Sequence, residues 1–88
     1  MEMSLHATMR QQQRGVRADV LSALINYGRV GHRGGQVFYM DKEARKLARA
    51  ELGRESYGRL ADKLNAYAVM SNDGVIVTVG KRLRRLKF

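Results

Sequence analysis

Two apolar segments near the end of the chain constrain its fold more than any other feature. The segments AYAVMS and VIVTVG flank Asn72-Asp73-Gly74, and such a turn between apolar runs is a strong signal for a β-hairpin. Ile76, Thr78 and the neighbouring valines favour strand, because branched side chains pack well on a pleated surface. The second segment therefore predicts a central strand that is covered on at least one face.

A second hairpin is predicted over residues 29–40. A short strand at 29–32 and a strand at 36–40 flank a tight turn at Gly34-Gly35, where adjacent glycines allow the positive φ angles of such turns. Because successive side chains of a strand point to opposite faces, only one of Phe38 and Tyr39 can belong to the core.

Two helices are predicted before this hairpin. Residues 4–15, SLHATMRQQQRG, form a short cationic helix that stops at Gly15. Residues 17–28, RADVLSALINYG, place apolar side chains at helical spacing and close at Gly28.

A helix, a break and a second helix are predicted between the hairpins. Asp41 is a suitable cap for a helix that begins at Lys42, and Gly53 interrupts it. A second apolar run restarts at Tyr57, with Ser56 as its expected N-cap.

These elements predict one α+β domain over residues 1–88, whose last eight residues form a basic tail. The expected architecture has two N-terminal helices and a roughly four-stranded antiparallel sheet built from two hairpins. The helix-break-helix is inserted between the hairpins, and the helices lie on one face of the sheet.

The charge points to an anionic partner. The chain has 17 Lys and Arg residues against 8 Asp and Glu residues, a net charge of +9, and a small basic domain most often meets nucleic acid. Much of the excess lies in the tail, KRLRRLKF. The candidate nucleic-acid-binding residues are Lys81, Arg82, Arg84, Arg85 and Lys87, with Arg33 near the first turn and the hydroxyl of Tyr39.

Other composition features exclude several classes. The chain has no cysteine, which fits a cytoplasmic protein. It lacks an apolar run long enough to span a membrane and a signal-peptide pattern at its start. Its two histidines and scattered carboxylates match no metal-ligand spacing, and no glycine loop suited to a cofactor phosphate is present, so we expect neither a metal nor a cofactor.

The chain resembles a family of small uncharacterised bacterial proteins. These open with H-A-x-x-R-x-x-x-R-G, contain F-Y-x-D-K-x-A-R, and close with A-Y-A-V-x-x-x-D-G-x-I-x-T-V-G and a basic end. The matching residues are His6-Ala7, Arg10, Arg14-Gly15, Tyr27-Gly28, Phe38-Tyr39, Asp41-Lys42, Ala44-Arg45, 66–69, Asp73-Gly74 and 76–80. The family pattern continues with histidine-arginine, where this chain has Lys81-Arg82.

More distantly, this arrangement looks like the fold of RelE-type toxins, a class of metal-free ribonucleases. The resemblance implies RNA rather than DNA as the partner, with the ribosome and an acidic antitoxin-like chain as further candidate partners. His6, Arg10 and Arg14 are four residues apart and share one helix face. In this hypothesis His6 transfers the proton, Arg10 and Arg14 clamp phosphate, and Arg82 reaches in with Arg85.

Two alternatives to an endoribonuclease stay open at this point. The chain can be a non-enzymatic nucleic-acid-binding module held by its tail and by the helical segment 42–65, or a structural protein that docks an acidic chain. His6 then only makes a local hydrogen bond or faces water, and Arg10 and Arg14 lie on a solvated surface. A homodimer contact is compatible with each of these readings.

Overall fold

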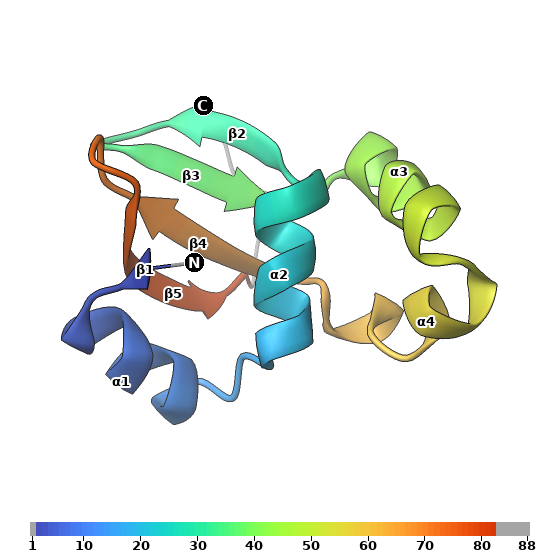
Figure 1. Ribbon diagram of the computed structural model, residues 1–88, viewed down its shortest axis with the longest axis horizontal. Coiled ribbons are helices and arrows are strands. Elements are labelled where there is room, and N and C mark those ends of the chain that lie inside the picture. Colours follow the sequence, from blue (N-terminus) through green and yellow to red (C-terminus); the bar gives the residue numbers. More distant parts are fainter. Residues whose placement is uncertain (1, 83–88) are drawn as a thin grey trace.

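The computed structural model describes residues 2–82 of the chain. It has the α+β class that the sequence predicts, with helices gathered beside one sheet (Figure 1). The elements are β1 Glu2–Met3, α1 Leu5–Gln13, α2 Ala18–Tyr27, β2 Arg29–His32, β3 Gln36–Tyr39, α3 Lys42–Leu52, α4 Arg54–Gly58, the 3₁₀ helix η1 Ala61–Lys63, β4 Ala66–Met70 and β5 Val75–Lys81.

Both predicted hairpins are confirmed, and they join into one sheet. β2 pairs with β3, β4 pairs with β5, and the antiparallel pairing of β3 with β4 connects the two hairpins. The positive φ angles of Gly34 and Gly74, 67° and 84°, explain why glycine occupies the two turns. A register shift at Val69/Met70 makes a bulge in the second hairpin.

The predicted four-stranded antiparallel sheet is wrong in one respect. The sheet has five strands in the order β1-β5-β4-β3-β2, and β1 runs parallel to β5. Glu2 aligns with Val75 and Met3 with Ile76. A two-residue strand has no periodicity that a sequence can display, so only the pairing itself reveals it.

The first helix begins and ends at the expected residues. The Ser4 hydroxyl accepts a hydrogen bond from the Ala7 amide at 3.1 Å, which caps α1. At its end Gly15, with a φ of 63°, donates to the carbonyl of Gln12, and Val16 donates to the carbonyl of Gln11. This pair of bonds is a Schellman motif, which satisfies the last carbonyls and turns the chain toward α2.

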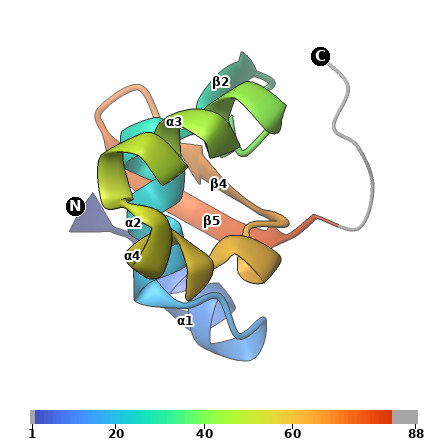
Figure 2. The same cartoon turned by 90° about the vertical axis from the view of Figure 1, so that its right-hand side faces the viewer.

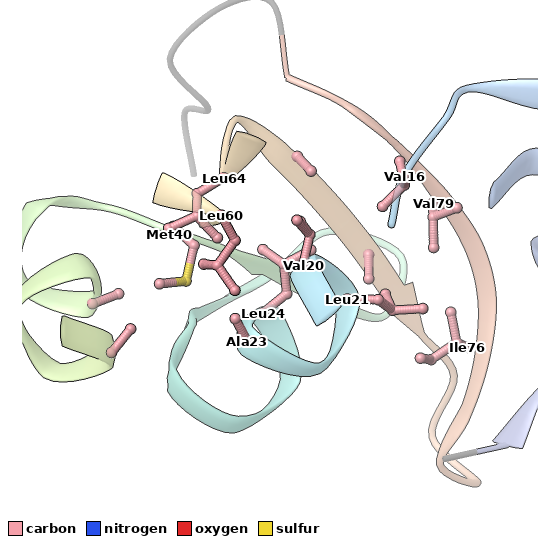
Figure 3. Close-up of a cluster of buried hydrophobic side chains, with 14 of the residues drawn as sticks. Val16, Val20, Leu21, Ala23, Leu24, Met40, Leu60, Leu64, Ile76 and Val79 are labelled. Carbon is pink, nitrogen blue, oxygen red and sulfur yellow. The ribbon is translucent and has the colours of Figure 1, made fainter. Parts of the chain in front are cut away.

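The core lies between the helices and one face of the sheet (Figure 3). α2 packs against β4, and Leu21 and Leu24 of the helix and Ala66 and Ala68 of the strand are buried in one core cluster. The small side chains of the alanines let a helix approach the strand closely. The other core side chains labelled in Figure 3 are Val16, Val20, Ala23, Met40, Leu60, Leu64, Ile76 and Val79.

The helix-break-helix is confirmed, but its second half differs from the prediction. The Asp41 carboxylate caps α3 by accepting from the Ala44 amide at 2.8 Å. Gly53, with a φ of 85°, then turns the chain directly into α4. The Tyr57 amide donates to the Gly53 carbonyl. The second helix therefore starts before Ser56, so Ser56 is not its N-cap. The run that follows continues as η1 instead of extending α4.

One arginine ties this helical segment to the sheet. Arg45 of α3 donates to the carbonyl of Ala61 at 3.0 Å and to the side-chain oxygen of Asn65 at 2.9 Å. Because Asn65 immediately precedes β4, these bonds hold η1 beside the entry of that strand.

All helices of the described part lie on one side of the sheet (Figures 1 and 2). The opposite side, named here the open face, has no helix of residues 2–82 against it. Phe38 packs against the core side, so Tyr39, as its neighbour in β3, belongs to the open face. None of the described helices has the length and apolar character needed to cross a membrane.

Candidate nucleic-acid interface

Two tyrosines lie side by side across the open face. Tyr39 of β3 pairs with Tyr67 of β4, and Tyr67 pairs with Gly80 of β5. Residues opposite each other in a sheet project to the same face, and both tyrosine side chains are only partly buried. The sheet therefore presents an aromatic row next to a position without a side chain.

Gly80 allows the Tyr67 ring to lie across the neighbouring strand. A Cβ atom on Gly80 would lie 2.7 Å from the Tyr67 Oη and 2.8 Å from its Cε1. Such distances are far shorter than van der Waals contact, so any larger residue here must displace the ring. Gly80 itself is buried beneath this ring.

Arg14 reaches the same spot from the end of α1. Its Nη1 also lies 2.7 Å from the position that a Gly80 Cβ would occupy, so the guanidinium is a close neighbour of the Tyr67 hydroxyl. Within residues 2–82, neither the Arg14 guanidinium nor the Tyr67 hydroxyl forms a hydrogen bond or ion pair. An arginine and a phenol thus meet here with their bonding capacity unused by the described chain.

Arg82 lies beside Tyr39, the other tyrosine of the row. Its guanidinium carbon lies 5.8 Å from the centroid of the Tyr39 ring, a cation–π distance. Nη2 donates to the Met40 carbonyl at 3.1 Å, and the backbone amide donates to the Asn65 carbonyl at 2.8 Å. These contacts fix the arginine beside the aromatic row.

Lys81 adds a third cation at this end of the sheet. It is exposed, and its Nζ lies 3.9 Å from the position that a Cβ on Gly15 would take. Because Lys81 pairs with the buried Ala66, its side chain projects to the helical side of the sheet, whereas Arg14 lies near Tyr67 and Arg82 lies near Tyr39. We name Arg14, Tyr39, Tyr67 and Arg82 the tyrosine–arginine face. Three of these four residues, namely Arg14, Tyr39 and Arg82, are among the candidates from the sequence.

His6 and Arg10 form a separate pair farther along α1. The Arg10 Nε donates to the His6 Nε2 at 3.5 Å on an exposed surface. The amide of Ser4 bonds to the carbonyl of Ile76, so α1 starts beside the beginning of β5. The strand rises ~20 Å from Ile76 to Arg82. The histidine and Arg82 thus belong to opposite ends of this strand.

The remaining predicted residues lie elsewhere. Arg33 is exposed in the turn between β2 and β3. Tyr39 is the last residue of β3, and the rise per residue of a strand places it ~13 Å from this turn. Arg84, Arg85 and Lys87 lie outside the described residues.

Tyr67 is a residue of this face that is not among the candidates from the sequence, because it stands in an apolar run. The signal that could have found it is alternation. Ala66 and Ala68 are small and fully buried, which requires Tyr67 between them to face the other way. Its partner Gly80 in the closing segment is the second signal, since aromatic residues often cover a glycine of the adjacent strand.

Metal ligation finds no geometric support, since residues 2–82 contain no cluster of three His, Asp or Glu side chains that could hold an ion. No family model, no curated protein and no solved structure matches this chain.

Replacing Gly80 by alanine tests the geometry of this face. The new Cβ must push the Tyr67 ring and Arg14 aside, and such overpacking lowers the free energy of unfolding by about 1–3 kcal/mol. Urea denaturation measures the loss, and the ring resonances of Tyr67 in NMR spectra report the displacement. Gly58→Ala is the control, because a Cβ at that position meets nothing within 4 Å. Unchanged Tyr67 resonances in Gly80→Ala would contradict the described packing.

Proposed function

We propose that this chain binds single-stranded nucleic acid, RNA in preference to DNA, on the tyrosine–arginine face. The observation that carries the proposal is the meeting of Tyr67 and Arg14 over Gly80, next to Tyr39 and Arg82. Aromatic rings and guanidinium groups on the face of a sheet are the groups that single strands use for binding.

Each group has a defined role in this proposal. Cβ atoms of cross-strand neighbours lie about 4.5–5.5 Å apart, so the rings of Tyr39 and Tyr67 offer adjoining platforms on which two bases stack. Arg14 meets a phosphate at the edge of the platform, where planar guanidinium suits paired phosphate oxygens. Base stacking is tolerant of sequence because every base has a π face, so we expect weak sequence preference.

The choice of RNA rests on the resemblance of the opening and closing segments to small bacterial proteins with a RelE-like arrangement. RelE-type proteins are ribonucleases, and the ribosome enters the proposal as a partner by the same analogy. A fold supports such an analogy without deciding function. The expected preference for RNA is therefore a part of the proposal that the binding experiments must test directly.

Replacing Tyr67 by leucine removes the ring while keeping an apolar side chain. We expect affinity for a short single-stranded RNA to fall about tenfold, since stacking contributes about 1–3 kcal/mol per base. Fluorescence polarisation with labelled RNA measures the affinity, and a DNA strand of the same sequence tests the preference for RNA. Tyr57→Leu is the matched control, because Tyr57 packs on the helical side. Equal losses in the two variants would count against the open face.

Replacing Arg14 by alanine tests the phosphate contact. We expect about tenfold weaker binding, and the slope of log affinity against log salt becomes shallower by about one. Arg49→Ala removes an equal charge from an exposed position in the last turn of α3 and should leave the slope unchanged. If both variants shift the slope alike, the contact is diffuse attraction to the whole surface rather than binding at Arg14.

Endoribonuclease activity is the second candidate function, favoured by the hydrogen bond between Arg10 and His6. In this contact Nε2 of His6 accepts from the Arg10 side chain. The same helix face continues to Arg14, so a proton-transfer group, a bridging arginine and a phosphate contact follow one line toward Tyr67. In this arrangement Arg82 binds the strand beside Tyr39 rather than sharing a site with His6.

Incubating the protein with total RNA and with translating ribosomes tests this activity. We expect His6→Ala to lower cleavage by at least about 100-fold, the scale of a lost proton-transfer group, while RNA binding persists. His32→Ala is the control, since that histidine is exposed on β2. Intact RNA with the unmodified protein, together with salt-sensitive binding, would leave a binding module without catalysis.

A further inference from the structure

A pocket of about 330 Å³ opens at the end of the sheet, next to the tyrosine–arginine face. It lies among the α1–α2 connection, the start of α2, η1 and the end of β5. Four of its lining residues are cationic, namely Arg17, Lys63, Lys81 and Arg82, and Asp62 is the only carboxylate among the described lining residues. The pocket is therefore suited to an anion carrying more than one charge.

Two cations of the pocket, Arg17 and Lys63, form exposed ion pairs that a ligand can replace. Arg17 pairs with Asp19 at 2.7 Å, and Lys63 approaches Asp62 at 3.5 Å, with all four side chains at least 40% exposed. Ion pairs in such exposed settings contribute little to stability. A phosphate that enters the pocket can thus recruit Arg17 and Lys63 without a large loss in the folded chain.

The pocket also has an apolar wall. Val16, Val20 and Ala66 line it and are 6%, 1% and 1% exposed, so their side chains belong to the rigid core. Its volume is at the lower end of small-molecule sites and exceeds what a bare phosphate needs. Together the wall and the cations suit a phosphate attached to a sugar and base.

We propose that this pocket binds a terminal phosphate monoester of a nucleotide, as the end of an RNA strand or as a free nucleoside monophosphate. A monoester carries about −1.5 to −2 charges at neutral pH, whereas an internal phosphodiester carries one. Four cations against Asp62 and the neighbouring Asp19 leave an excess of positive charge, which favours a terminus. The strand-end form rests on the proposed RNA binding, because Arg82 both lines the pocket and lies over Tyr39.

The test compares one short RNA in three forms, with a 5′-phosphate, with a 3′-phosphate and with neither. We expect one phosphorylated form to bind about tenfold tighter than the form with hydroxyl ends. Calorimetry with adenosine monophosphate and with inorganic phosphate, using the full chain, measures the pocket without a strand.

Three variants locate the effect. Lys63→Ala should abolish the advantage of the terminal phosphate, and Asp62→Asn should enlarge it about twofold, because it removes the opposing carboxylate. Both residues are exposed and neither belongs to the tyrosine–arginine face. Lys46→Ala removes an equal charge from the exposed surface of α3 and should leave the ratio of affinities unchanged.

The outcomes separate this inference from the proposed function. Equal affinity for all three RNAs, with no heat from adenosine monophosphate, overturns the pocket and leaves RNA binding intact. Binding of adenosine monophosphate that depends on Lys63, without any RNA binding, supports the pocket as a free-nucleotide site while the proposed function fails. Inorganic phosphate that binds as tightly as the nucleotide overturns the role of the apolar wall.

Discussion

The packing of α2 on β4 is the contact on which the rest of the structure depends. Ala66 and Ala68 of β4 and Leu21 and Leu24 of α2 are buried in one core cluster, and β4 lies between β3 and β5, so this strand joins both hairpins to the core. Because side chains alternate along a strand, burial of the two alanines places Tyr67 on the open face. The same packing that stabilises the fold therefore orients the main aromatic residue of the candidate interface.

The interface is assembled from segments that are distant in the chain. The Schellman motif at Gly15 ends α1 so that Arg14 reaches Gly80, and the pairing of β3 with β4 brings Tyr39 beside Tyr67. A glycine at the centre of this arrangement is a structural requirement, since the Tyr67 ring and the arginine occupy the space of its missing side chain. The site thus depends on register, and a shift of one residue in either hairpin would dismantle it.

The cations of the described chain differ in whether they already have a hydrogen-bond or ion-pair partner. Many cations of the described chain are engaged, such as Arg45 with Ala61 and Asn65, or Arg29 with Asp41 at 3.2 Å. Arg14 instead lies near the Tyr67 hydroxyl, over Gly80, and has no acidic partner among residues 2–82. Such a cation retains its full capacity for a phosphate, which favours binding at the tyrosine–arginine face over a general attraction.

The sequence by itself determined the local elements, because their causes lie within a few residues: the caps at Ser4 and Asp41, and the turns at Gly34 and Gly74. The sequence also identified Arg14 and Arg82 as candidate binding residues, because their side chains are cationic. Tertiary structure alone decided the fifth strand and the pocket that Arg17 and Lys63 both line. These depend on pairings between distant segments, whose register follows from how the whole core packs rather than from any local pattern.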